Sequence, residues 1–148
     1  MAQVTLTPAF GSAVTGQLQI VPMGDGVQVT GQITGLQPGS THAIHIHENG
    51  DCSAPDASSA GGHFNPAGSE HGKVARGAHH AGDMDNIVAD ANGTSQVDRH
   101  ASGPSLDAGA ADNVIGRAVI VHATADDYTS QPSGNAGARL ACGVIVAR

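Results

Sequence analysis

The sequence predicts an all-β protein, and three features of its composition and pattern support that fold class. Val, Ile and Thr are frequent, 21 glycines and 7 prolines punctuate the chain, and convincing helical periodicity is absent. Short β-branched runs between turns that contain Gly or Pro are typical of antiparallel strands. We therefore expect about eight strands arranged as a Greek-key β-barrel or β-sandwich with two long functional loops.

The length and charge of the chain limit the classes of function. Its 148 residues fit a single domain, residues 1–148, with an ordinary hydrophobic core. The formal net charge is −7, with six lysines and arginines in total, so no basic patch exists to bind nucleic acid or an anionic membrane. No apolar run approaches the roughly 20 residues of a membrane span. Because strand-like sequence begins at Val4, we expect no signal peptide, so the protein stays in the cytoplasm or a leader precedes this chain.

Alternating apolar and polar residues indicate the first strands. Residues 4–7 and 17–21 alternate in this way, and a Gly-Asp-Gly turn leads into residues 27–34. In this third range every second residue from Val27 to Ile33 falls on one face, and Gln and Thr occupy the other. Such half-buried alternation is characteristic of an antiparallel sheet.

A pair of histidines marks the next predicted strand, residues 41–47. In a strand His45 and His47 share one face, about 7 Å apart along the chain. Two imidazoles on a rigid strand face can ligate one metal ion with little ordering cost. Paired histidines can also be surface or hydrogen-bonded core residues, but the histidines that follow favour a metal. His42 lies on the opposite face, where hydrogen bonding is its expected role.

Periodicity disappears from about residue 48 to residue 86. A loop of this length inside a compact domain is either disordered or functional. It contains five candidate metal ligands, namely His63, His71, His79, His80 and Asp83. We therefore expect a functional, metal-binding loop.

Strand patterns and turn residues also indicate the strands of the second half of the chain. The strand pattern resumes at residues 87–89, and an Asn-Gly dipeptide predicts a hairpin into residues 94–99. A connection rich in small residues leads to residues 114–122, whose apolar run is expected to be fully buried. A second irregular stretch, about residues 123–141, precedes a final strand at residues 144–146.

The two cysteines, Cys52 and Cys142, leave three possibilities open: a disulfide, two free thiols, or part of a metal site. A bridge would close a loop of about 90 residues and stabilise the fold by roughly 4–5 kcal/mol in the chain-entropy model. Disulfides also fit an oxidising compartment better than the cytosol. This favours a periplasmic or otherwise extracytoplasmic location, with the cytoplasm as the alternative.

Six segments form an ordered series of motifs. They are His42-Ala43-Ile44-His45-Ile46-His47, Gly61-Gly62-His63-Phe64-Asn65-Pro66, His71, His80-Ala81-Gly82-Asp83, Ile115-Gly116-Arg117 leading to Val121-His122, and residues 134–143. In order and spacing they resemble the copper/zinc superoxide dismutase family. The stretch around Cys52 and the His79-His80 doublet are most similar to bacterial members. The resemblance implies an eight-stranded Greek-key β-barrel of the immunoglobulin-like sandwich type.

The resemblance also implies two ligand sets and one copper and one zinc ion per chain. Copper would be held by His45, His47, His63 and His122. Zinc would be held by His63, His71, His80 and Asp83. Imidazoles around an open position suit redox copper, and three histidines with one carboxylate suit structural zinc. The shared histidine would bind through both ring nitrogens.

Three further polar residues need separate interpretations. Only His80 matches the His-x-Gly-Asp pattern of the family, so we interpret His79 as loop surface. His100 lies at a strand end without a motif, and we expect it on the solvated surface. Asp127 is interpreted as a loop charge or a cap.

Two features implied by the resemblance would support the metal sites. Asp126 matches a carboxylate that links a copper ligand and a zinc ligand, here His45 and His71, through their distal N–H groups. A Cys52–Cys142 disulfide would tie the long loop to the base of the last strand.

The implied reaction is the disproportionation of superoxide to dioxygen and hydrogen peroxide, an antioxidant activity in which copper cycles between Cu(II) and Cu(I). Arg139 would dock the anion, and His63 would leave copper and carry a proton. Residues 128–133 contain no lysine or glutamate, so the guiding charges of eukaryotic members are missing. We expect Arg139 and the metals to dominate steering, aided by Lys73 or Arg76.

Three alternatives compete with the enzyme. A non-catalytic copper/zinc carrier is the main one, but silent relatives typically lack a copper histidine or the arginine, whereas Arg139 and all four copper candidates are present here. An adhesion β-sandwich would leave the histidines unexplained. A blue-copper protein would need a cysteine ligand, and both cysteines are expected to form the bridge. Many family members are dimers and some bacterial ones are monomers, so a homodimer is compatible with the resemblance.

Overall fold

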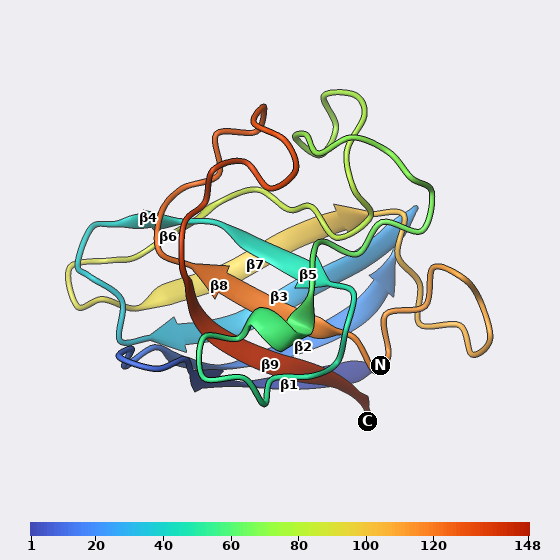
Figure 1. Cartoon of the computed structure of the whole chain (residues 1–148). Coiled ribbons are helices and arrows are strands. Elements are labelled where there is room, and N and C mark those ends of the chain that lie inside the picture. The colour runs from blue at the N-terminus through green and yellow to red at the C-terminus, as the bar shows by residue number, and fades with distance from the viewer.

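The computed structural model describes residues 1–148 and confirms the predicted all-β class (Figure 1). The strands are β1 (Ala2–Pro8), β2 (Thr15–Met23), β3 (Gly26–Thr34), β4 (Thr41–His42), β5 (Ile44–His47), β6 (Ile87–Val88), β7 (Ser95–Ser102), β8 (Ala118–His122) and β9 (Arg139–Ala147). One short 3-10 helix, η1 (Ser58–Ala60), lies in the first long loop. No helix is long and apolar enough to span a membrane.

The strands pair in a single curled sheet and a small second one. Seven antiparallel strands follow the order β5-β8-β9-β1-β2-β3-β7, and β4 pairs with β6. Because β4 directly precedes β5 in the chain and β6 lies against β7, the two ends of the large sheet approach each other through the small one. This arrangement matches the predicted Greek-key barrel.

The structure has nine strands rather than about eight because the predicted strand at 41–47 is interrupted at Ala43. The N–H of Ala43 donates to the carbonyl of Thr124, and its carbonyl accepts from the N–H of His122. Residue 43 therefore pairs with the last residue of β8 and the chain just beyond it, where the pairing of β8 with β9 also shifts in register between Val121 and His122. β4 turns away to pair with β6.

Alternation along the strands builds the core as expected. Val27, Val29 and Ile33 of β3 are fully buried, and a cluster of 23 buried residues fills the barrel. Burying one large aliphatic side chain stabilises a fold by about 1.5–3 kcal/mol. The sheet is thus a rigid support for the loops.

Strand β5 is buried on both faces. Ile44 and Ile46 belong to the hydrophobic core, whereas His45 and His47 point to the other side. The connection after β5 covers that side, since the N–H of Ile46 donates to the carbonyl of Gly82. The two histidines are consequently held beneath the long loop.

The two long connections lie at one side of the barrel. Figure 1 shows the green-to-lime loop after β5 and the orange-to-red loop after β8 rising together at the top of the view. The expected disulfide between Cys52 and Cys142 is present and joins the first loop to β9. Both loops are therefore anchored around the same face.

Candidate metal centre

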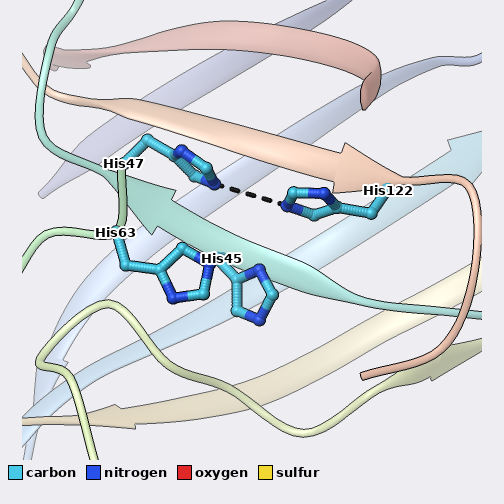
Figure 2. A group of neighbouring side chains, drawn as sticks. All are labelled: His45, His47, His63 and His122. Carbon is cyan, nitrogen blue, oxygen red and sulfur yellow. Dashed lines mark hydrogen bonds between the residues drawn. The ribbon is translucent and has the colours of Figure 1, made fainter. Parts of the chain in front are cut away.

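Four histidine rings converge at the end of β5. His45 and His47 come from β5, His122 ends β8, and His63 comes from the loop (Figure 2). The Nε2 atoms of His47 and His122 are 3.3 Å apart, and the ring centroids of His45 and His63 are 3.9 Å apart. Each ring offers a nitrogen that lies within 4.8 Å of the others, so this group could hold a metal ion.

Hydrogen bonds on the outer side of these rings determine which nitrogen faces the centre. Nε2–H of His45 donates to Asp126 at 2.8 Å, and Nδ1–H of His47 donates to the carbonyl of Gly61 at 2.8 Å. Nδ1 of His122 lies 3.5 Å from a backbone carbonyl. Because the distal nitrogens carry the protons, the inner nitrogens are free to act as ligands.

Two inner nitrogens of the four-histidine cluster indicate that it is suited to a metal ion. Nδ1 of His45 and Nε2 of His63 are buried and have no hydrogen-bond partner. An unsatisfied buried polar atom costs about 1–3 kcal/mol. A cation between these rings would satisfy both lone pairs at once, so the donor set fits the copper ion that the sequence predicts.

A second cluster surrounds the carboxylate of Asp83. Nδ1 of His63 lies 3.0 Å from Nδ1 of His80 and 3.0 Å from Oδ1 of Asp83. Nδ1 of His71 lies 2.9 Å, and Nδ1 of His80 3.7 Å, from the same oxygen. Tetrahedral zinc with bonds of about 2.0–2.1 Å separates its ligand atoms by about 3.3 Å. These four side chains therefore fit a zinc site.

His45 also lies within 4.8 Å of the donor atoms of His63, His71 and Asp83. Its Nε2 is committed to Asp126, however, and its Nδ1 faces the first cluster, which favours His80 as the remaining zinc ligand. His79 joins neither cluster, because its Nδ1–H donates to the carbonyl of His80 at 2.7 Å.

Gly82 explains how the His-x-Gly-Asp segment reaches β5. Its carbonyl accepts a 2.9 Å hydrogen bond from the N–H of Ile46. A Cβ atom added at Gly82 would overlap the carbonyl oxygen of Ile46. Only glycine allows this close approach, which sets Asp83 beside the histidine rings.

Asp126 connects the two clusters. Its Oδ1 accepts from Nε2–H of His71, and its Oδ2 accepts from Nε2–H of His45, both at 2.8 Å. Asn86 fixes the backbone of Asp126, since its Oδ1 accepts from the N–H at 2.8 Å and its Nδ2 donates to the carbonyl at 3.0 Å. The structure thus places Asp126 between the two predicted ligands.

The charges of the metal-free clusters differ. Burial lowers the pKa of His45 to about 4 and holds those of His47 and His122 well below their usual value, so these rings are neutral at pH 7. Burial also opposes protonation of His71, but hydrogen bonds to two carboxylates outweigh it and raise its pKa to about 9. Burial opposes ionisation of those carboxylates, yet the hydrogen bonds from histidines lower their pKa.

Arg139 lies beside a polar cavity of about 470 Å³ that opens onto the first cluster. Its Nη1 donates to the carbonyl of Ala57 at 2.9 Å and its Nη2 to the carbonyl of Gly61 at 2.6 Å. Burial lowers the pKa of Arg139, but a guanidinium remains charged at neutral pH. Glu48 and Ser133 also line the cavity.

Lys73 and Arg76, which the sequence suggests as aids to steering, do not line this cavity. Lys73 pairs with Asp85 at 2.6 Å, and its Nζ lies 4.8 Å from the ring centre of Tyr128. The Cζ of Arg76 lies 5.9 Å from the same ring. Both cations are engaged on the outer side of the zinc cluster, so Arg139 is the one lysine or arginine in the cavity wall.

A family model described as copper/zinc superoxide dismutase (SODC) matches residues 14–145. The chain belongs to the copper/zinc superoxide dismutase family. It is 41% identical over 135 residues to "Superoxide dismutase [Cu-Zn] 2" of Aquifex aeolicus, covering 89% of this chain and 79% of that protein. It is also 41% identical over 147 residues to "Superoxide dismutase-like protein YojM" of Bacillus subtilis, covering 97% and 74%.

Solved structures agree with this assignment to the superoxide dismutase family. A crystal structure of a SOD-like protein from Bacillus subtilis superposes with a TM-score of 0.86 at 40% identity, covering 96% of each chain. The clock protein EA4 superposes with a TM-score of 0.84 at 38% identity, covering 98% of this chain and 92% of that one.

Three further residues of this superoxide dismutase homologue lie where the sequence predicts. His42 is buried and hydrogen-bonded, with Nδ1–H donating to the carbonyl of His122 at 2.8 Å. Asp127 caps a turn, since its Oδ1 accepts two backbone N–H groups at 2.8–2.9 Å. His100 lies at the surface, 2.7 Å from Asp25.

Sequence reasoning missed two residues of this dismutase-type centre. Asn86 holds Asp126, and Gln131 bonds the backbone of His71. Neither asparagine nor glutamine is a usual ligand of copper or zinc, and their partners lie 40 and 60 positions away in the chain. The only available signal was that each stands next to a recognised motif or loop.

Proposed function

We propose that the chain is a copper/zinc superoxide dismutase, which converts two superoxide anions and two protons to dioxygen and hydrogen peroxide. The observation that supports this most strongly is the pair of buried, unpartnered nitrogens, Nδ1 of His45 and Nε2 of His63, beside the cavity that Arg139 lines. A redox ion held there would be open to a small anion from one side.

The proposal assigns one copper and one zinc ion to each chain. Copper would be held by His45, His47, His63 and His122, and zinc by His63, His71, His80 and Asp83. When bound, copper supplies the one-electron change between Cu(II) and Cu(I) that disproportionation needs. The zinc set would fix the orientation of His63 through its Nδ1 side.

The protein's own groups have three tasks in this reaction. Arg139 attracts and orients superoxide with a fixed cation, which matters because the net charge of −7 repels anions at long range. His63 lines the cavity and belongs to the first cluster, and its Nε2 has no hydrogen-bond partner, so this is the ring atom proposed to hold and deliver a proton. Asp126 keeps the distal protons of His45 and His71 in place.

We infer an extracytoplasmic location, periplasmic in a bacterium. The Cys52–Cys142 disulfide supports this inference, because such bonds persist mainly in oxidising compartments. The measurement is the redox state of the two cysteines in protein taken directly from the producing cell.

A non-catalytic copper/zinc carrier is the alternative. One relative is named a superoxide dismutase-like protein, and a protein of similar structure is named a clock protein. These names do not state a dismutase activity. Arg139 favours turnover, because a carrier does not need a cation that docks an anion beside the copper site.

The deciding experiment loads the purified chain with copper and zinc and follows superoxide decay by stopped-flow absorbance. Metal content is measured on the same sample. We expect rapid decay that requires copper and is absent from the metal-free chain. A chain that holds both metals without accelerating decay would overturn the enzyme proposal in favour of the carrier.

A further inference from the structure

The side-chain amide of Gln131 joins the two long loops. Its Oε1 accepts from the backbone N–H of His71 at 2.8 Å, and its Nε2 donates to the backbone carbonyl of the same residue at 2.7 Å. The amide therefore satisfies both main-chain groups of one predicted zinc ligand, as a neighbouring strand would.

The turn that carries Gln131 is held by its own hydrogen bonds. Oδ1 of Asp127 accepts from the N–H groups of Thr129 and Ser130 at 2.9 and 2.8 Å. The N–H of Gly134 donates to the carbonyl of Ser130 at 2.7 Å, and that of Asp127 to the carbonyl of Gly134 at 3.0 Å. Because the turn is closed on itself, it presents Gln131 in a fixed position.

The residues that follow Gln131 belong to the copper cavity. Pro132 and Ser133 line its wall, together with Arg139 and three of the four predicted copper ligands, His47, His63 and His122. Gln131 thus has a predicted zinc ligand on one side and the wall of the cavity on the other. Gln131 contacts the backbone of His71 directly before the wall residues Pro132 and Ser133, whereas Asp126 contacts the His71 ring from an earlier position in the same loop.

A second contact reinforces the same pair of loops. Lys73, two positions after His71, lies over the ring of Tyr128. The hydroxyl of Tyr128 accepts a 3.1 Å hydrogen bond from the N–H of Asn86, which holds the ring.

Glutamine is suited to position 131 because its side chain is uncharged and supplies both a hydrogen-bond donor and an acceptor. A lysine or glutamate would supply only one of the two.

We propose that Gln131 is a positioning residue that couples the zinc site to the wall of the copper cavity. Zinc bound at His71 holds the segment of Pro132 and Ser133 in place, and the amide of Gln131 carries that restraint. This inference rests on the metal centre proposed above, and it assigns no contact between Gln131 and either metal.

The test compares Gln131→Met, which keeps the side-chain length but removes both hydrogen bonds, with Gln19→Met, an exposed glutamine on β2. Zinc affinity is measured by chelator competition, and Cu(I) affinity by competition with a cuprous chelator. We expect Gln131→Met to weaken zinc binding by about 10- to 100-fold, in the range typical of residues that support metal ligands, and to leave Cu(I) binding unchanged. Gln19→Met should match the parent chain for both metals.

Hydrogen exchange supplies the readout of the coupling. In the parent chain, zinc should slow amide exchange in residues 129–134 as well as at His71. In Gln131→Met, zinc at saturating concentration should protect the zinc ligands as before but protect residues 129–134 less than in the parent chain, because only the link through Asp126 remains. A stability defect alone would not separate these two responses.

Two results would overturn the proposal: unchanged zinc affinity in Gln131→Met, or an equal loss of zinc and Cu(I) affinity, which would indicate general damage. Zinc-dependent protection of residues 129–134 in the variant that equals that of the parent chain would also contradict it. If the parent chain bound no zinc, the metal centre itself would fail, which is a different outcome.

Discussion

Nε2–H of His71 donates a 2.8 Å hydrogen bond to Oδ1 of Asp126. The other oxygen of the same carboxylate accepts from His45, so one acidic side chain orients a predicted zinc ligand and a predicted copper ligand. The two clusters therefore depend on the same group, and most of the predictions below follow from this arrangement.

Replacing Asp126 by asparagine should weaken zinc binding by about 10- to 100-fold, because an amide can accept from one imidazole N–H but its NH₂ group repels the other. Zinc affinity is measured by chelator competition. Asp107→Asn removes one negative charge from an exposed loop position and is the matched control. Equal zinc affinity in the two variants would argue against the bridging role.

Gly134→Ala should disturb Asp126 directly. Gly134 has a φ of +74°, and an added Cβ would overlap Oδ1 of Asp126. Gly109 has a φ of +80° with no atom within 4 Å, so Gly109→Ala carries only the backbone cost, about 1–2 kcal/mol. We expect both variants to melt lower than the parent, but only Gly134→Ala to lose zinc, as measured by metal analysis. Equal zinc contents would contradict the steric argument.

Arg139→Ala should slow superoxide decay by about tenfold or more and weaken its dependence on ionic strength, since it removes the cation of the cavity. Copper and zinc contents should stay unchanged. Arg76→Ala removes the same charge outside the cavity and should leave the rate near that of the parent chain. Loss of copper from Arg139→Ala would count against a docking role.

The metal-free protein should be most stable near pH 6.5 and less stable on either side. The pKa of His45 is lowered to about 4, so its contribution is present above its unfolded pKa of about 6.5 and is lost as the pH falls toward 4. The pKa of His71 is raised to about 9, so its contribution is complete below about 6.5 and is lost as the pH rises through 9. Melting temperatures between pH 4 and 10 measure both limbs, and a flat alkaline limb would refute the assignment for His71.

Removing the Cys52–Cys142 disulfide should lower the melting temperature and increase hydrogen exchange in the first long loop. The bridge spans a sequence separation of 90 residues, for which the chain-entropy model gives about 4–5 kcal/mol. The measurement compares the oxidised chain, the reduced chain and the Cys52→Ser, Cys142→Ser double variant. An unchanged melting temperature on reduction would show that β9 holds the loop without it.

Local sequence patterns predicted many of the strands and the candidate metal ligands of this protein. The alternation from Val27 to Ile33 defines a half-buried strand by itself, and the structure confirms it. Each candidate ligand stands within a short motif, such as the glycine-containing segment that ends at Asp83. The order and spacing of these motifs resemble a known family, and it was this resemblance that implied the two ligand sets before the fold was known.

Other features depend on contacts between distant segments and had no local signal. The interruption at Ala43 arises from pairing with the chain beyond β8, and nothing in residues 41–47 indicates it. Lys73 and Arg76 lie over the ring of Tyr128, and no pattern in the sequence around them indicates that contact. Gln131 meets His71 only because two long loops fold onto each other.

Strand β5 presents Ile44 and Ile46 to the hydrophobic interior and His45 and His47 to the metal clusters. Ligand affinity and folding free energy are consequently linked by mass action through four residues: ions that bind only the native chain shift the unfolding equilibrium, and a poorly packed interior weakens ion binding in return. Replacing Ile46 by valine should therefore lower the affinity for the metal ions, although the removed methyl group faces away from both clusters.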